Sequence, residues 1–258
     1  MRPNRKLFLS ISGGIVVLAA LTLWLNHVPE PKLNGVGLGH YIDNAAQQVD
    51  LARIIPQFGL AAVPYLAKQI EPDPIRELLH RASQKFSIEH DLLRKDWATY
   101  QQRRARALSF FYLLGPDGVE AALPTIITLA ERPEDPAFYS ALPFLSMALG
   151  TEHEVRALHA LIAALKVKHR SRGYAKPLVY GMLPKFKNHP GIIMPPLIDS
   201  LHEPGGYKRI DIVVSFGTNA IPALREATRS ETNHVRPATV ALERILAASA
   251  VGVSAHAK

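Results

Sequence analysis

The chain of 258 residues is 48% hydrophobic and 20% charged, a composition that excludes a largely disordered protein. It contains no cysteine, which excludes disulfide scaffolds, thiol nucleophiles and cysteine-ligated zinc or iron–sulfur sites. Its 30 lysines and arginines exceed its 22 aspartates and glutamates, so anionic partners deserve consideration.

An apolar stretch without charged side chains fills residues 7–25, preceded by Arg2, Arg5 and Lys6. As a helix it would be about 28 Å long, close to the thickness of a bilayer's hydrocarbon core. Because positive charge prefers the cytoplasmic side, residues 1–27 are predicted to form a single-pass anchor or uncleaved signal in the cell (inner) membrane. The N-terminus would be cytoplasmic and the rest periplasmic or otherwise extracytoplasmic. The alternative is a cleaved signal peptide and a secreted protein.

Residues 28–40 carry two prolines and three glycines and are predicted to be a linker, because this composition does not continue a helix. Beyond it the apolar residues recur with helical spacing, as Ala107, Phe110 and Phe111 do. No Asn-Gly or Asp-Gly pair is expected to close a β-hairpin between alternating runs. The chain is therefore predicted to be all-α, ending in a disordered tail at 249–258.

A phrase of glycine, small or apolar residues and then proline recurs four times. A glycine just past a helix end accepts the left-handed conformation, and a proline in a first helical turn removes only an N–H without a partner. Each copy therefore predicts a helix, a tight turn and a second helix. The four pairs are Gly59 and Pro64, Gly118 and Pro124, Gly191 and Pro196, and Gly217 and Pro222. A degraded fifth copy lies at 151–165, with His159 in place of the proline.

Four short segments carry a resemblance to a known family: Ala-Val-Pro-x-Leu at 62–66, Val-Arg-Ala-Leu at 155–158, Ala-Ile-Pro-Ala-Leu at 220–224 and HVRPATVALERI at 234–245. They resemble HEAT repeats of the armadillo type, closest to the short bacterial kind similar to phycobilisome-lyase repeats. The resemblance covers about residues 42–248. It implies an α-solenoid over residues 41–248, with about five antiparallel helix pairs in a right-handed superhelix, each pair burying its apolar face against its neighbours.

Residues 71–100 separate the first two copies and are predicted to be a helical insertion. The insertion is either an additional charged helical pair or a protrusion that docks a partner. Trp97 and Tyr100 are its candidate docking residues, since aromatic side chains often anchor interfaces. Trp97 could equally belong to the core.

Sequence motifs of catalysis are missing, and the histidines do not form a metal-binding pattern. A HEAT-like enzyme family, deoxyhypusine hydroxylase, places His–Glu pairs at equivalent repeat positions to hold two irons. Here His153-Glu154 precedes a helix and His202-Glu203 ends one, so the two pairs are not equivalent. The acidic pair Glu134-Asp135 is expected to be solvated in a proline-rich turn. No catalytic residue, metal or cofactor is predicted.

Basic residues gather at the expected unit boundaries. The densest group has no acid within it and is the candidate patch for an anionic partner: Lys166, Lys168, Arg170, Arg172 and Lys176. Others at boundaries are Arg103, Arg104, Arg106, Lys185, Lys187, Lys208 and Arg209. Stacked repeats would align such loops into a basic stripe. Ordinary solvated loops, with cations that complement helix C-termini, explain the same residues.

The resemblance implies a non-catalytic scaffold that is tethered to the membrane and binds a protein partner. One alternative is an enzyme or enzyme-modifying factor on the same scaffold, such as a metal-dependent hydroxylase or a lyase-like protein. Another is a binder of nucleic acid or of an anionic surface. Export across the membrane argues against nucleic acid.

Overall fold

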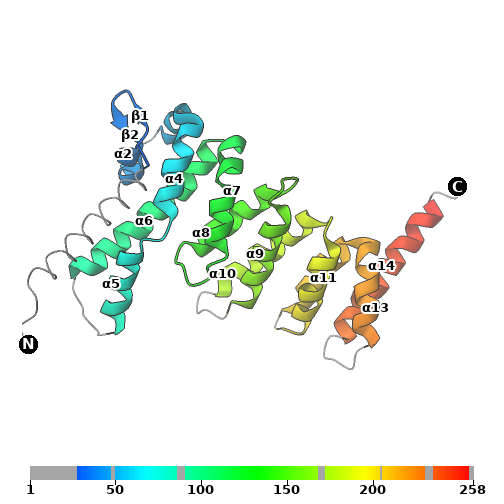
Figure 1. The fold of residues 1–258 in the computed structure, drawn as a ribbon. Helices are drawn as coiled ribbons and strands as arrows, with labels where there is room; N and C mark the ends of the chain where they lie inside the picture. The colour runs from blue at the N-terminus through cyan, green and yellow to red at the C-terminus, as the bar shows by residue number, and fades with distance from the viewer. Residues whose placement is uncertain are drawn as a thin grey trace, which may run out of the picture.

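The computed structural model describes residues 28–47, 50–85, 91–167, 172–203, 205–229 and 235–255. This part of the chain is all-α apart from one short hairpin, and its helices follow one another along an elongated molecule (Figure 1). The expected anchor at 1–27 lies outside these residues. Among the helices that are described, none combines the length and the apolar character needed to cross a membrane.

The expected linker is a folded segment. Strands β1 (Lys32–Leu33) and β2 (Val36–Gly37) pair antiparallel, and helix α2 (Leu38–Asp43) follows directly. The turn uses Asn34 and Gly35, whose φ angles are +51° and +81°. A two-residue hairpin turn needs positive φ at both positions, which Asn-Gly supplies. The expectation that no Asn-Gly pair would close a hairpin was therefore wrong, because these strands are too short to show alternation.

This hairpin segment is attached to the body of the protein. The Gly39 N–H donates to Glu30 Oε1 at 2.6 Å, and the Tyr65 hydroxyl donates to the same oxygen at 3.4 Å. Leu38 is fully buried, and Val28 packs against the hydrophobic core. Residues 28–40 are therefore attached to the body near both ends, while Asn34 and Gly35 of the turn are exposed.

The remaining elements lie in this order. The N-terminal ones are η1 (Ala45–Gln47), α3 (Leu51–Ile54), η2 (Ile55–Ala61), α4 (Ala62–Ile70), α5 (Pro74–Lys85), α6 (Asp91–Leu113) and α7 (Pro116–Ala130). The next are α8 (Phe138–Ala141), η3 (Leu142–Ala148), α9 (Glu154–Lys166), α10 (Arg172–Met182), η4 (Leu183–Phe186), α11 (Pro190–Asp199) and η5 (Ser200–His202). The last are α12 (Gly206–Ser215), η6 (Gly217–Ala220), α13 (Ile221–Arg229) and α14 (Val235–Ala255).

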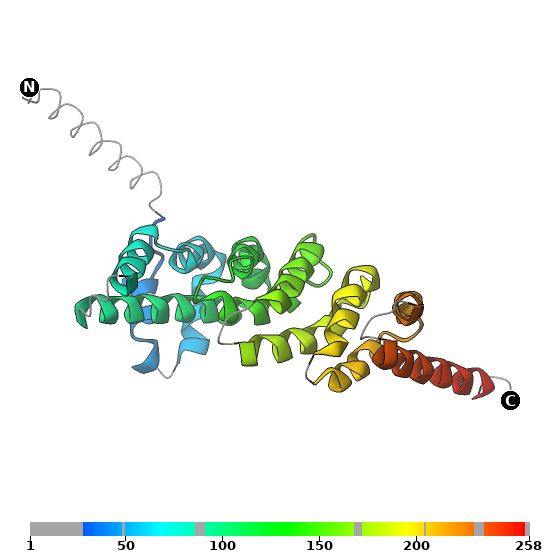
Figure 2. The same ribbon diagram turned by 90° about the horizontal axis from the view of Figure 1, so that it is seen from below.

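The helices form two layers. Figure 2 shows α4, α7, α9, α11 and α13 along one side of the molecule and α6, α10, α12 and α14 along the other. Helices close in sequence are in contact, including α4 with α6 and α7, α7 with α9, α9 with α10, α11 with α13, and α13 with α14. One hydrophobic core runs between the layers.

Short 3₁₀ segments end several helices and share a pattern of apolar residue, proline, any residue, apolar residue. Helices α3, α8 and α10 continue directly into η2, η3 and η4, each with a proline at its second position. The proline lacks the N–H that would continue the α-helical hydrogen bonding, which favours a change to a short 3₁₀ turn there. The apolar residues of the pattern are all buried: Ile55 and Phe58, Leu142 and Leu145, Leu183 and Phe186.

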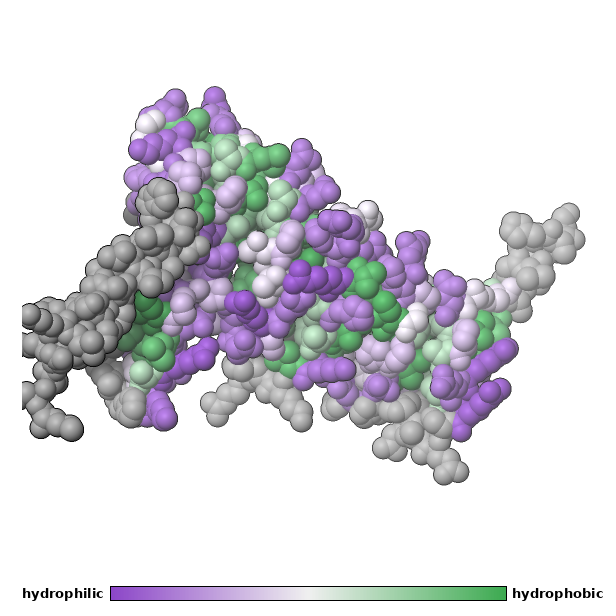
Figure 3. Space-filling model, in the orientation of Figure 1, coloured by the Kyte–Doolittle hydropathy of each residue, from purple (hydrophilic) through white to green (hydrophobic). Residues whose placement is uncertain are grey.

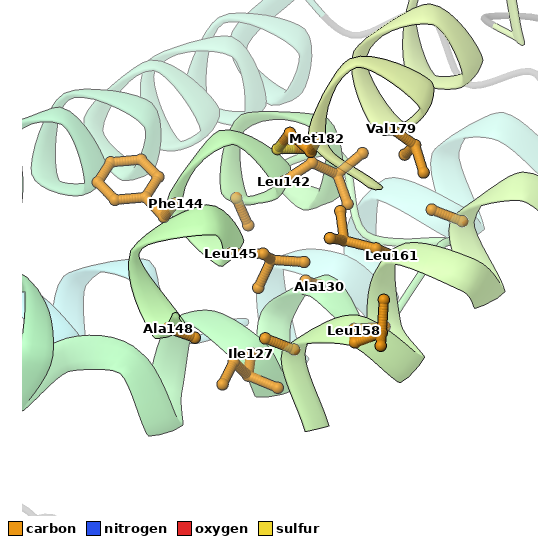
Figure 4. Packing of buried hydrophobic residues seen from close by; sticks show 14 of the residues in the cluster. Ile127, Ala130, Leu142, Phe144, Leu145, Ala148, Leu158, Leu161, Val179 and Met182 are labelled. Atoms are coloured by element: carbon orange, nitrogen blue, oxygen red, sulfur yellow. The ribbon is translucent and has the colours of Figure 1, made fainter. Parts of the chain in front are cut away.

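Helix η3 illustrates how these turns contribute to the core. Figure 4 shows its apolar side chains between those of α7, α9 and α10. The labelled residues are Ile127 and Ala130 of α7, Leu142, Phe144, Leu145 and Ala148 of η3, Leu158 and Leu161 of α9, and Val179 and Met182 of α10. All ten are at most 5% exposed. The 3₁₀ turns therefore join the two layers instead of lying outside them.

The glycines of the recurring phrase divide into two kinds. Gly59 and Gly217 have the expected positive φ, +55° and +57°, although Gly59 has a ψ of −156° and so is not left-handed helical. Gly118 and Gly191 instead lie inside α7 and α11 without positive φ, so the turns expected there are not present. Glycines with positive φ that the phrase did not identify precede α7, α9 and α12, at Gly115, Gly150 and Gly205.

Two further expectations, both about where helices begin and end, were wrong. Residues 91–113 form the single helix α6, so the second half of the expected insertion continues into the next unit without a break. Helix α14 extends through Ala255, so residues 249–255 are helical and not a disordered tail. Small residues with high helix propensity, such as Ala247 and Ala248, favour this extension.

Candidate interaction surface

Several residues singled out in the sequence serve the fold. Arg104 is completely buried and forms a bidentate ion pair with Asp135, at 2.8 and 2.7 Å. Its guanidinium also donates to the Ile70 carbonyl at 2.7 and 2.9 Å, while Asp135 accepts a hydrogen bond from the Ala137 N–H. Asp135 was expected to be solvated, and this was wrong because the arginine on α6 requires a buried counterion.

Tyr100 is buried beside this ion pair. Its hydroxyl accepts a hydrogen bond from the Asp73 N–H at 2.6 Å and lies 3.3 Å from the Glu71 carbonyl oxygen as a donor. Burial raises the pKa of Tyr100 above its ordinary value. Trp97 is half-buried and stacks on His80 with 4.0 Å between ring centroids. Of the two candidate docking residues, Tyr100 therefore fixes the link between α4 and α5 and is not exposed for docking.

The expected basic stripe is only partly described, and several of its members are engaged within the protein. Lys176 Nζ contacts both carboxylate oxygens of Glu203, at 2.6 and 2.8 Å. Arg209 is buried and donates to the Ser200 and Glu203 carbonyls. Arg106 donates to the Asp43 carbonyl at 2.7 Å.

The rest of the candidate anionic patch is less defined. Lys166 is exposed at the end of α9, and Arg172 begins α10. Lys168 and Arg170 lie outside the described residues. Lys176, the fifth member, forms an ion pair with Glu203. The patch therefore stays a prediction from sequence.

A first hollow lies between the C-terminal end of α4, the helix α7 and the helix α9. Its volume is about 450 Å³. Apolar and hydroxyl side chains form much of its lining, with Arg132 and Arg156 as its basic residues. The full lining is Ile70, Glu71, Pro72, Pro124, Thr125, Thr128, Leu129, Arg132 and Arg156.

Arg156 is held in position at the edge of this hollow. It donates to both carboxylate oxygens of Glu131, at 2.8 and 2.6 Å, and to the Thr128 hydroxyl at 3.0 Å. The hydrogen bond from Arg156 lowers the pKa of Glu131, and the same bond raises the pKa of Arg156. The guanidinium is therefore oriented by two partners while about half of it stays exposed.

A second hollow of about 630 Å³ adjoins the first on the N-terminal half of α7. Pro124 borders both hollows. Acidic side chains dominate this lining, which consists of Asp117, Glu120, Ala121, Pro124, Gly150, Thr151, Glu152 and His153. The first hollow thus carries two arginines, of which Arg156 is paired with Glu131, and the second hollow carries three acidic side chains. Figure 3 shows this side of the molecule, with hydrophilic side chains around smaller apolar areas.

The prolines of the recurring phrase lie on this same side of the molecule. Pro64, Pro124 and Pro222 are exposed on α4, α7 and α13. Pro196 is half-buried on α11, and His159, which replaces the proline in the degraded copy, is exposed on α9. Pro64 and Pro222 lie in the first turn of α4 and α13, as the phrase predicts. Pro124 and Pro196 lie inside α7 and α11, so the helix starts expected at these two prolines were wrong.

The two His–Glu pairs have structural contacts. Glu154 accepts the Gly150 N–H at 2.7 Å, and its other oxygen lies 3.0 Å from His189 Nε2. Glu203 contacts Lys176 and accepts through its carbonyl from Arg209. Within the described residues, no three or more His, Cys, Asp or Glu side chains gather as a metal site would require.

Sequence reasoning missed the Arg104–Asp135 pair although a signal was present. Arg104 stands three, four and seven residues before Ala107, Leu108 and Phe111, so it shares their apolar stripe. A charged residue on a buried stripe requires a counterion nearby. The two hollows left no comparable signal, because they depend on how separate helices pack.

Comparison of the chain with protein families, with curated proteins and with solved structures finds no match.

Proposed function

We propose that this chain is a non-catalytic scaffold, tethered to the membrane by residues 1–27, whose α7 surface binds an extended segment of a protein partner. The body would be an α-solenoid of HEAT-like pairs, wound right-handed. Its five pairs would be α3/η2 with α4, α6 with α7, α8/η3 with α9, α10/η4 with α11, and α12/η6 with α13. The recurring change from helix to 3₁₀ turn to helix supports this division.

The observation that carries the binding proposal is the pair of adjoining hollows that meet at Pro124. Both are open and elongated together along α7, a form that suits an extended peptide more than a compact small molecule. Arg132 and Arg156 would face acidic residues of the partner, and Glu120 and Glu152 would face basic ones. Such complementary charges fix the direction in which a segment lies.

A photo-crosslinking residue tests this surface. We would place it at exposed Ala121, beside the second hollow, and at exposed Ala105 on α6 as the control. Crosslinking in native membranes should join a partner at position 121 and not at position 105. Equal crosslinking at both positions, or none at 121, would contradict the proposal.

Charge reversal then tests the direction in which the partner segment lies along α7. Arg132→Glu and Glu120→Lys should each reduce capture of the same partner, because each places like charges opposite one another. Glu243→Lys, an exposed change on α14 distant from both hollows, is the matched control and should leave capture unchanged. Topology is tested separately by a C-terminal reporter, which should be active on the extracytoplasmic side.

A further inference from the structure

Helix α5 exposes an apolar face that the rest of the described chain does not cover. Ile75, Leu78 and Leu79 are 69%, 67% and 49% exposed, and no residue of α5 is buried. Their spacing of three and four residues places them on one side of the helix. In Figure 3 apolar surface is visible on α5 at the left end of the molecule. Three adjacent aliphatic side chains in water indicate a contact surface.

The length of chain before the described body limits what can cover this face. Residues 7–25 are apolar and uncharged, and Val28 already packs against the core. Two residues separate them, so Val28 lies within about 10 Å of the end of the apolar stretch even at full extension. Because residues 28–40 are folded onto the body, the body has no long tether on which to move away.

The position of α5 is consistent with a bilayer that lies close to Val28. In Figure 2 the first described residues, in dark blue, and α5 lie at the same end and on the same side of the molecule. A bilayer that holds residues 7–25 would therefore lie at the end of the molecule where α5 is placed.

The charged side chains of α5 also suit contact with a bilayer that contains anionic lipids. The helix carries Arg76, Arg81 and Lys85 against the single acid Glu77. Arg81 and Lys85 are exposed at the C-terminal end of the apolar face, and Arg81 also forms a surface ion pair with Glu77 at 3.2 Å. An apolar face flanked by basic side chains is typical of helices that lie in the interface of a bilayer with anionic lipids.

We propose that α5 lies on the bilayer surface next to the anchor, with Ile75, Leu78 and Leu79 inserted among the lipids. The helix would enter by about 5–10 Å, the depth usual for interfacial helices. This inference rests on the proposed membrane tether and goes beyond it. It gives the scaffold a fixed orientation, with the N-terminal end against the membrane and the other pairs extending from it.

The absence of cysteine allows a direct test in the full chain, because a single introduced cysteine takes one fluorescent label. We would label Leu78→Cys on α5, Leu246→Cys on α14 as an equally apolar exposed control, and Leu18→Cys in the apolar stretch. The protein would be incorporated into vesicles of phosphatidylethanolamine with phosphatidylglycerol, or of phosphatidylcholine alone. A spin label on the lipid acyl chains quenches from the bilayer, and iodide quenches from water.

We expect the label at position 78 to shift its emission to shorter wavelength and to lose emission to the acyl-chain quencher. The label at 246 should respond to iodide alone. The shift at 78 should be larger with phosphatidylglycerol, and the double change Arg81→Gln and Lys85→Gln should remove that difference.

The other outcomes separate the two proposals. If position 18 is quenched from the lipid and position 78 only by iodide, the tether stands and the α5 contact is overturned. If neither is quenched from the lipid, both are overturned. A label at 78 shielded from both quenchers would mean that protein, including a second copy of this chain, covers the face, which also overturns the lipid contact.

Discussion

Arg104 is the largest of the fully buried side chains in the described part of the protein, and it connects three segments. It contacts the C-terminal end of α4 through Ile70 and the loop after α7 through Asp135. Ile70 and Asp135 together accept four hydrogen bonds from the guanidinium, and the Gln101 side chain accepts a fifth at 3.4 Å, so all five of its N–H donors have partners. The ion pair therefore fixes α6 relative to the end of α4 and to the loop after α7, and residues of α4 and α7 border the first hollow.

Removing one member of this pair should be costly. Asp135→Ala leaves a buried guanidinium without a counterion, which typically reduces the free energy of unfolding by about 3–5 kcal/mol. Glu131→Ala breaks the half-exposed pair with Arg156 and should cost less than about 1 kcal/mol, because water screens it. Urea unfolding of the two variants measures both values. Similar costs would mean that the buried pair has no special structural role.

His80 should make the packing of α5 dependent on pH. Burial lowers the pKa of His80, so the folded protein binds its proton less readily than the unfolded chain does. The neutral stack on Trp97 thus stabilises the protein above the ordinary histidine pKa of about 6.5, and this stability is lost as the pH falls through the lower folded value. In a Trp24→Phe background, Trp97 fluorescence should change over that range. The variant His80→Gln should show no such transition.

Among the elements, the 3₁₀ turns and the hairpin show where sequence patterns reach their limit. The apolar stripe of α6 predicted burial correctly for Ala107, Phe110 and Phe111. The segment from Ile55 to Phe58 also has helical spacing, and periodicity alone does not distinguish a 3₁₀ turn from the last turn of an α-helix. Short strands such as Lys32–Leu33 contain too few residues for alternation. Elements set by tertiary contacts were therefore the ones missed.

Two glycines of the same phrase should respond differently to alanine. Gly217 has a φ of +57° with open space around it, so Gly217→Ala should cost about 1–2 kcal/mol through backbone strain alone. Gly191 lies in α11 with nothing within 4 Å, so Gly191→Ala should be neutral or stabilising by up to about 1 kcal/mol. Thermal or urea unfolding compares the two. A loss of stability at both positions would mean that Gly191 also occupies a strained turn.

In the whole molecule, the helices are arranged in the order in which they follow one another in the sequence. Helices contact those near them in sequence, and a single core extends along the row. The sequence predicted this all-α arrangement because the apolar residues of most helices repeat with a helical period. It did not predict the hollows of α7, since Pro124 and Thr128 of α7 meet Arg156 of α9 only after the helices pack.

If the pairs form the proposed array, damage at one end should stay there. Leu224 is fully buried on α13, and Leu224→Ala typically costs about 2–5 kcal/mol. Hydrogen exchange should accelerate in α12–α14 and remain unchanged in α4–α7, because each unit depends on its neighbours. Leu66→Ala on α4 is the matched control and should give the reverse pattern. Uniform acceleration in both variants would indicate one cooperative globule.

If residues 1–27 tether the protein to a membrane, as proposed, the folded segment at residues 28–40 with its hairpin at 32–37 bears on how the protein could be released. Many surface proteins are shed when a protease cuts an extended stalk next to the bilayer. Here the carboxylate of Glu30 and the side chains of Val28 and Leu38 hold that segment against the body. A protease would have to wait for the hairpin to open before it could cut there, so shedding at this segment would be governed by the stability of the N-terminal helices.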